Sequence, residues 1–244
     1  MALPNVRKIF IPDRGKVIVD ADLSGADAMV VAAEAEDTGM LADMRAGIDI
    51  HSKNATDIWG STFTALSPTE RRIRRGQCKI GVHATNYGAS ARTLASNPAV
   101  GWPLRVAEDF QRRWFDRHPG IKAWHTRTSS ELLTKRTIRN RFGYRIVYFD
   151  RIDVLLPQAL AWTPQSTVAE VCFRGALRLR SEYPWAEILL NVHDSIVFQI
   201  PTHRHSPGTM EEIAKVLEVP VPYPEPLVIP WKVKASEKSW GDCE

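Results

Sequence analysis

Several features that define common protein classes are scarce in this sequence of 244 residues. It contains three cysteines, Cys78, Cys172 and Cys243, which are odd in number and lack a metal-binding spacing. That usage excludes a disulfide scaffold and predicts a reducing, cytoplasmic-type compartment. No stretch approaches the ~18 uncharged apolar residues of a membrane span, so we expect no membrane partner. Pro4 and Pro12 interrupt the apolar run that a signal peptide needs.

Nucleotide-binding signatures of the glycine-rich kind are also missing. The sequence has no P-loop and no G-x-G-x-x-G, and it has no His/Cys cluster of the kind that binds zinc. Hydrophobic residues make up 44% of the chain and charged residues 25%, the composition of an ordinary globular protein. Wholesale disorder is therefore excluded, and the length suits one or two domains of about 150 residues each.

Positive charge is concentrated rather than large. The formal net charge is +4, yet residues 105–145 hold eleven basic residues against four acidic ones, a net +7. A second basic cluster precedes it, at Arg71, Arg72, Arg74, Arg75 and Lys79. Such a surface attracts polyanions, of which nucleic acid is the commonest. A solvated basic face has the same composition, and charge alone does not choose between the two.

The pattern along the chain predicts strands at both ends and helices between them. Residues 17–19 are β-branched and end at Asp20-Ala21-Asp22, which predicts a buried strand. From about 37 to 135 we expect mostly helix with breaks at Gly and Pro. Ser67-Pro68-Thr69-Glu70 is a capping box that starts one helix, which we expect to end near Asn86.

The last third of the chain predicts a return to mixed structure. Residues 142–149 alternate like a strand, and 165–180 have the pattern of an amphipathic helix. Two strands, 187–192 and 196–200, are joined by only three residues. The proline-rich tail from Pro201 is expected to wrap the surface. The fold class is therefore α+β, a sheet-based domain with a helical domain inserted in it.

Two acidic residues lie where predicted strands stop. Asp22 ends the first strand, and Asp194 occupies the tip of the tight hairpin. Two carboxylates brought together from different strands can hold Mg²⁺ ions for phosphoryl chemistry. Each also has an ordinary interpretation, Asp194 as a turn former and Asp22 as a loop acid.

The helix that begins at Ser67 carries a more specific pattern. Arg75, Lys79, His83 and Tyr87 recur every four residues and so share one face. Lys79 and Tyr87 lie about 12 Å apart along the axis, a distance that suits a triphosphate and the sugar or base attached to it. A basic surface helix with one tyrosine packed into the core fits the same spacing.

The D-x-D pattern of Asp20-Ala21-Asp22 at the end of a strand also occurs in two other classes of enzyme. A haloacid dehalogenase-type phosphohydrolase begins with such a D-x-D, its first Asp being the nucleophile, and glycosyltransferases bind metal through D-x-D. Neither class accounts for the helix at 67–87 or for the hairpin at Asp194.

Taken together, these stretches resemble the three motifs of the family A, DNA polymerase I-like DNA polymerases, especially phage members. Asp22-Leu23-Ser24-Gly25-Ala26-Asp27 resembles the first motif, and Val192-His193-Asp194-Ser195 resembles the third. The second, the nucleotide-binding helix, resembles Arg75-Gly76-Gln77-Cys78-Lys79 continued through His83 to Tyr87. Further matches are Asp49-Ile50-His51, Pro119-Gly120-Ile121-Lys122, Phe142-Gly143-Tyr144-Arg145 and Pro164-Gln165-Ser166-Thr167. The matches run in order over nearly the whole chain.

The resemblance implies a fold and a set of domains. It implies a polymerase right-hand palm, an antiparallel sheet with helices, from 1–35 and 146–244, with mostly helical fingers from 36–145. No thumb or exonuclease domain is matched. The implied reaction is template-directed transfer from a dNTP to a primer 3′-hydroxyl on primer–template DNA, in the cytoplasm of a bacterial or phage-infected cell.

The resemblance also implies residue roles. Asp22 and Asp194, with the Leu23 carbonyl, would bind two Mg²⁺ ions, Mn²⁺ being an alternative, and Lys79 would act with them as a catalytic residue. The nucleotide-binding residues would be His51, Arg75, Lys79, His83, Tyr87 and Asp27. Asp27 would be the sugar gate, the residue that crowds the 2′ position of the sugar. The DNA-binding residues would be Gln165, His193 and Arg145.

Some positions depart from the family pattern. Ser195 replaces the usual Glu, His83 the usual Phe or Tyr, and Asp27 is shorter than the usual Glu. The missing thumb leaves three hypotheses: a fragment, a reduced enzyme, or one half of a split polymerase whose second polypeptide supplies the thumb and the rest of the palm. A single-subunit RNA polymerase-like enzyme and a non-catalytic nucleic-acid-binding remnant are the other functions that the motifs leave open.

Overall fold

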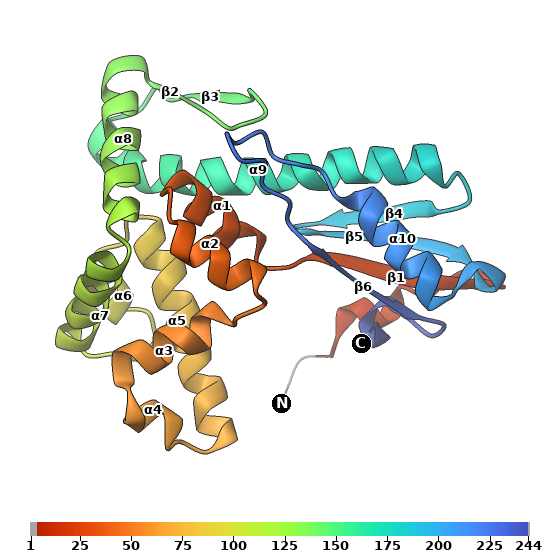
Figure 1. Cartoon of the computed structure of the whole chain (residues 1–244), viewed down its shortest axis with the longest axis horizontal. Coiled ribbons are helices and arrows are strands. Elements are labelled where there is room, and N and C mark those ends of the chain that lie inside the picture. The colour runs from red at the N-terminus through yellow and green to blue at the C-terminus, as the bar shows by residue number, and fades with distance from the viewer. Residues whose placement is uncertain (1–3, 244) are drawn as a thin grey trace. The chain divides into compact units, whose positions relative to one another are not determined.

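The computed structural model describes residues 4–243, and they form two compact units. One unit consists of Met1–Ala26 together with Ser166–Glu244, and the other consists of Asp27–Gln165. The second unit is thus inserted in the sequence of the first. The strands of the first unit and the helices of the second confirm the predicted α+β class (Figure 1). No helix within residues 4–243 is long and apolar enough to cross a membrane.

The first unit is built on a four-stranded antiparallel sheet in the order β4-β5-β1-β6. Its strands are β1 (Lys16–Leu23), β4 (Glu187–Val192), β5 (Ser195–Pro201) and β6 (Trp231–Ser236). The inner strand β1 contributes Val17, Ile18, Val19 and Ala21 to the core, and all four are fully buried. β1 runs through Asp20-Ala21-Asp22, where the pattern predicted its end, and stops one residue later at Leu23, since its pairing with β5 continues through Asp22.

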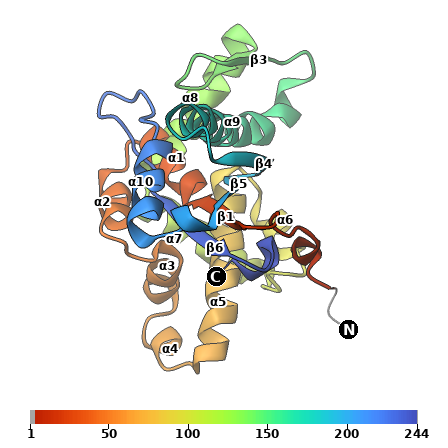
Figure 2. The ribbon, with the colours of Figure 1, turned by 90° about the vertical axis from the view of Figure 1, so that its right-hand side faces the viewer.

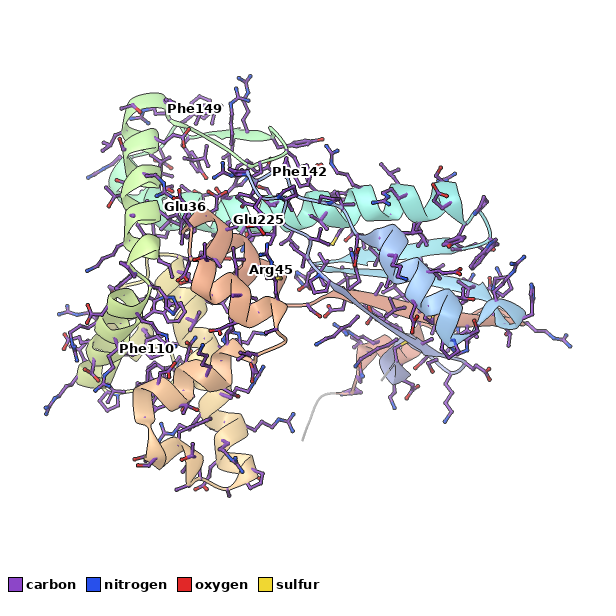
Figure 3. All side chains as sticks on the ribbon, in the orientation of Figure 1. Glu36, Arg45, Phe110, Phe142, Phe149 and Glu225 are labelled. Carbon is purple, nitrogen blue, oxygen red and sulfur yellow. The ribbon has the colours of Figure 1, made fainter. Side chains whose placement is uncertain are left out.

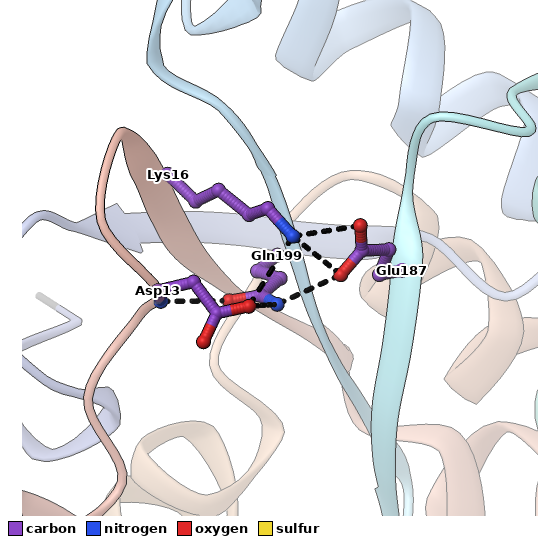
Figure 4. Close-up of polar contacts among 4 residues, drawn as sticks. All are labelled: Asp13, Lys16, Glu187 and Gln199. Atoms are coloured by element: carbon purple, nitrogen blue, oxygen red, sulfur yellow. Dashed lines mark hydrogen bonds and ion pairs between the residues drawn. The ribbon is translucent and has the colours of Figure 1, made fainter.

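A polar network joins the strands at one end of this sheet (Figure 4). Lys16 Nζ donates to Glu187 Oε2 over 2.6 Å, and Gln199 Nε2 donates to Glu187 Oε2 over 2.8 Å and to Asp13 Oδ2 over 2.7 Å. The amide of Gln199 is almost wholly buried, so the two carboxylates satisfy donors that would otherwise be costly to bury. The network fixes the register of β1, β4 and β5.

The tail after Pro201 contains regular structure that the sequence did not predict. It forms two short 3-10 helices, η2 (Thr202–Arg204) and η3 (Trp240–Asp242), together with the helix α10 (Pro207–Leu217) and the strand β6. Ser206 caps α10 by accepting from the backbone N–H of Thr209, and Pro207 occupies the first helical turn. β6 pairs with β1, more than 200 residues earlier, so no local pattern announces it. Near the N-terminus, η1 (Val6–Ile9) contacts η3.

The second unit is mainly helical. Its helices are α1 (Ala26–Glu34), α2 (Thr38–Arg45), α3 (Ile50–Trp59), α4 (Ser61–Thr64), α5 (Pro68–Asn86), α6 (Ala91–Ala95), α7 (Leu104–Arg117) and α8 (Pro119–Lys135). They confirm the helical block expected from about 37 to 135, with breaks at the predicted Gly and Pro positions. Phe110 of α7, labelled in Figure 3, is fully buried in the core of this unit. Figure 2 shows α3 and α5 side by side, in agreement with their contacts.

A short hairpin and a long helix complete the chain. β2 (Thr137–Arg139) pairs with β3 (Arg145–Val147), so only part of the strand expected over 142–149 is formed. α9 runs over Ile152–Glu182, thirteen residues earlier than the predicted start at Gln165, and it includes Pro157 and Pro164. Each interior proline removes a helical hydrogen bond. Burial of apolar side chains such as Ala159 and Leu160 offsets that cost, which the sequence pattern does not reveal.

Candidate active site

The predicted acidic pair lies on neighbouring strands of the sheet unit. Asp22 is the last but one residue of β1, and its Cα partner on β5 is Ser195. Asp194 immediately precedes Ser195, and its backbone carbonyl accepts a hydrogen bond of 2.9 Å from the Leu23 N–H. Pairing between β1 and β5 therefore brings the Asp22 and Asp194 backbones together.

The turn that presents Asp194 has only two residues, His193 and Asp194. His193 has a φ of 56°, in the left-handed region that side chains other than glycine rarely adopt. Strain of this kind persists when the flanking pairing over-determines it, here the register of β4 with β5. His193 is exposed and Ser195 is buried, so the turn leaves the imidazole in solvent at the end of the hairpin.

The charges at this end of the sheet favour a bound cation. Burial raises the pKa of Asp22, and the negative charges of Asp194 and Asp20 raise it further, against smaller opposing effects of Lys232 and Arg7. A site of clustered carboxylates is relieved by a divalent cation, and carboxylate oxygens are the ligands that Mg²⁺ prefers. Among the described residues, no group of three or more His, Cys, Asp or Glu side chains could hold a metal. The protein thus offers a pair of carboxylates, and Mg²⁺ sites of this kind usually take their other ligands from water and substrate phosphates.

The basic helix of the second unit has the predicted limits. α5 begins with the predicted capping box: Ser67 accepts from the Glu70 N–H, and the Glu70 carboxylate accepts from the Ser67 N–H over 2.9 Å. It ends at Asn86, with Tyr87 as its C-cap residue. Lys79 is exposed and Arg75 and Tyr87 are partly buried, so the face carries both accessible charge and a packed ring.

Arg75 has an acidic partner that the sequence did not reveal. Its Nε lies 2.5 Å and its Nη2 2.9 Å from the two carboxylate oxygens of Asp49, a bidentate pair. Burial alone would raise the pKa of Asp49, but hydrogen bonds from Arg75 and Ser52 outweigh it and lower the pKa to about 2. An anion that uses Arg75 therefore has to compete with Asp49.

His83, on this helix face, has a second histidine beside it. The rings of His51, from α3, and His83, from α5, have centroids 6.1 Å apart. Burial lowers the pKa of His51 to about 4, with further lowering by His83 and Arg75. His51 is therefore neutral at neutral pH and can donate or accept a hydrogen bond without adding charge.

Asp27, the predicted sugar gate, is held from two sides. Its Oδ1 accepts a hydrogen bond from the Tyr87 hydroxyl, and its Oδ2 lies 3.1 Å from His83 Nδ1. Burial, together with the Asp27 charge, raises the pKa of the Tyr87 hydroxyl, so Tyr87 stays protonated and remains a donor. The second unit thus brings together Asp27, His51, Arg75, His83 and Tyr87.

The predicted DNA-binding residues are all exposed. Gln165 lies in α9, Arg145 begins β3, and His193 occupies the β4–β5 turn. The basic stretch 105–145, which ends at Arg145, has less free positive charge for DNA than its net charge of +7 indicated. Several of its arginines already contact acidic side chains. These pairs are Arg112–Asp109, Arg113–Asp109, Arg117–Asp57, Arg127–Glu36 and Arg141–Glu34.

The sequence patterns gave no polymerase role to four residues near the carboxylates and the basic helix: Asp20, Asp49, Lys232 and Trp240. Asp20 was considered only as the nucleophile of a phosphohydrolase, although residues i and i+2 of a strand share a face, which places it on the same face as Asp22. Asp49 follows the family pattern before His51 but had no assigned role. Lys232 and Trp240 belong to a tail without a recognisable local signal.

The sequence was also compared with protein families of known function. The model of DNA polymerase family A matches residues 2–242. This chain belongs to DNA polymerase family A. Curated relatives include the thermostable DNA polymerase I of Thermus aquaticus, 27% identical over 238 residues, and DNA polymerase I of Bacillus caldotenax, 28% identical over 234. These alignments cover 94% and 88% of this chain but only 27% and 26% of the relatives, so the chain spans about a quarter of their length.

A solved structure of this family shares the fold. It is the POL domain of Pol1 from M. smegmatis in complex with DNA primer-template and dNTP. The TM-score is 0.78 at 19% sequence identity, over 98% of this chain and 42% of that one. This likeness confirms the predicted polymerase-type α+β fold.

Proposed function

We propose that this family A chain is the palm-and-fingers portion of a template-directed DNA polymerase, transferring a nucleotide from a dNTP to the 3′-hydroxyl of a primer. The observation that carries the proposal is the β1–β5 pairing, which sets Asp22 beside Asp194 on neighbouring strands. Family membership supports it. In this proposal the palm is 1–35 with 146–244, which contains the sheet unit, and the fingers are 36–145, which lie within the helical unit.

Asp22 and Asp194, with the Leu23 carbonyl, hold two divalent cations in this proposal, Mg²⁺ first and Mn²⁺ as an alternative. The fit rests on the hard oxygen donors and on the charge crowding that raises the pKa of Asp22. Such cations, when bound, favour loss of the primer hydroxyl proton and stabilise charge on the transferred phosphate. The carboxylates supply their position.

Arg75 and Lys79 bind the triphosphate. Lys79 is exposed and one turn along α5 from Arg75, so both cations can meet one polyphosphate chain. Lys79 also donates a proton to the departing pyrophosphate, because an ammonium close to the leaving oxygen is a competent general acid. Arg75 exchanges Asp49 for phosphate, and the neutral His51 adds a hydrogen bond.

Asp27 selects the sugar in this proposal. A carboxylate near the 2′ position crowds and repels a 2′-hydroxyl, and the contacts from Tyr87 and His83 hold this short side chain in place. Tyr87 stacks in the insertion site. Gln165 and His193 contact the minor groove of the primer–template, and Arg145 contacts its phosphates, which positions the duplex without reading its sequence.

A primer-extension assay tests the catalytic proposal. The wild-type chain should add nucleotides in the presence of Mg²⁺, and Asp194→Ala should lose that activity. Asp116→Ala is the matched control, because Asp116 is exposed on α7, where its carboxylate pairs with Arg112. DNA binding without incorporation by the wild-type chain, even with a candidate partner added, would favour a non-catalytic remnant.

The second polypeptide of a split polymerase remains part of the proposal. Apolar surface supports it: Ile188 and Leu189 are 38% and 43% exposed on β4, which is an edge strand of the described sheet. Exposed apolar edges of this kind are usually covered by another chain or segment. Primer extension with and without the neighbouring gene product tests the idea, and robust processive synthesis by the chain alone would refute it.

A further inference from the structure

Asp20 belongs to a hydrogen-bonded group beside the acidic pair. Its Oδ1 accepts from the Ser195 hydroxyl, and its Oδ2 accepts from Trp240 Nε1 over 2.8 Å. Both carboxylate oxygens therefore have donors, from β5 and from η3. A carboxylate held in this way keeps one orientation, as a group that supports a neighbouring site has to do.

The strand register explains why these residues meet. Asp20 and Asp22 are two residues apart on β1 and share a face of the sheet. Ser195 is the β5 partner of Asp22, so it lies diagonally across from Asp20 on that face. Trp240 covers the same face, where it packs with Ile18 and Val197 in a buried cluster.

Asp20 adds a negative charge near the acidic pair, whereas the family pattern has this charge on the residue that follows the motif Asp. The usual Glu after the motif Asp is Ser195 in this chain, and the Ser195 hydroxyl donates to Asp20. The charge of Asp20 acts on Asp22, as that of Asp194 does. Lys232, the β6 partner of Asp22, offsets part of this charge.

We infer that Asp20 is a positioning residue of the cation site. It orients Ser195 through their hydrogen bond, and its negative charge replaces that of the third carboxylate, which position 195 lacks. We assign Asp20 no direct contact with the ion, because both of its carboxylate oxygens already accept hydrogen bonds, from Ser195 and from Trp240. The Ser195 hydroxyl donates its one hydrogen bond to Asp20, so its oxygen can only accept hydrogen bonds from other neighbours, such as water on a hydrated cation. The inference rests on the proposed two-carboxylate site.

Direct binding of Mn²⁺ to the full chain without DNA, followed by electron paramagnetic resonance of the free ion, tests the inference. Asp20→Asn should weaken binding about 10- to 100-fold, the usual cost of losing a residue that orients a metal ligand. Asp13→Asn makes the same change in the polar network of Figure 4 and should leave binding unchanged. Asp22→Asn should abolish it.

A double variant separates positioning from a general loss of structure. Asp20→Asn with Ser195→Asp moves the charge across the same hydrogen bond, with the Asn amide now donating, and should restore most of the affinity. If Asp20→Asn does not fold, Ser195→Ala should still weaken Mn²⁺ binding severalfold. Wild-type affinity in both Asp20→Asn and Ser195→Ala, or no Mn²⁺ binding by the wild-type chain, would overturn the inference.

The two proposals fail in different ways. A wild-type chain that binds Mn²⁺ through Asp20 but incorporates no nucleotide would refute the polymerase proposal and keep the positioning role. A chain that incorporates nucleotides with the same Mn²⁺ affinity before and after Asp20→Asn would do the reverse.

Discussion

Protonation of His51 should make the helical unit less stable in mild acid. The pKa of His51 is lowered from 6.5 to about 4 in the folded chain, because the ring is buried and has His83 and Arg75 nearby. Between these values the unfolded chain binds a proton that the folded chain does not. Stability therefore falls as the pH falls from about 6.5 to 4, and the loss is small above pH 7.

The size of the effect follows from the two pKa values. A displacement from 6.5 to about 4 corresponds to about 3 kcal/mol once the pH is well below 4. At pH 5 the unfolded-state histidine is almost fully protonated and the folded-state one is not, which gives a loss of about 2 kcal/mol relative to pH 7.5. His118 and His125 also have pKa values lowered first by burial, so the contribution of His51 has to be isolated by substitution.

Urea unfolding of the wild type and of His51→Asn at pH 7.5 and 5.0 isolates it. The variant should lose about 2 kcal/mol less than the wild type between the two pH values, whatever its stability at pH 7.5. Ile50→Val is the matched control, since Ile50 is a buried, non-titrating neighbour in α3 and its substitution should cost about 1 kcal/mol at both pH values. An unchanged pH dependence in His51→Asn would refute the reasoning.

Four other variants test the site and the fold. Asp27→Ala should raise ribonucleotide incorporation in primer extension, and unchanged incorporation would make the gate assignment wrong. Asp49→Asn should tighten dNTP binding up to about fivefold, since the half-exposed pair with Arg75 is worth at most about 1 kcal/mol; weaker binding in a titration would show that Asp49 orients Arg75 for the ligand. Gly120→Ala places a Cβ against the Ala35 carbonyl oxygen and should lower the free energy of unfolding by more than about 2 kcal/mol, as measured by thermal unfolding. Gly76 in α5 has open space around it, so Gly76→Ala should raise the free energy of unfolding by about 0.5–1 kcal/mol.

Local signals predicted the elements that local chemistry determines. The capping box at Ser67 and Glu70 gave the start of α5, and the short link between two apolar runs gave the hairpin that carries Asp194. The four-residue spacing on α5 gave the basic face with Tyr87. In each case the determining residues lie within a few positions of one another, so the sequence pattern contains the information.

Long-range contacts account for what the sequence did not predict. The Trp240 hydrogen bond to Asp20 joins residues 220 positions apart, and β6 has its partner at the other end of the chain. The start of α9 depends on burial that outweighs two prolines. The charge of residues 105–145 is partly neutralised by acids outside the stretch, such as Asp57 and Glu34. None of these contacts has a periodic signature.

Single-nucleotide incorporation on four primer–templates that differ in one templating base tests the central claim most directly. With Mg²⁺, the wild-type chain should add only the complementary dNTP on each template, and Asp22→Asn should add none. Incorporation that ignores the templating base, or that persists in Asp22→Asn, would contradict a template-directed reaction carried by the Asp22 and Asp194 carboxylates.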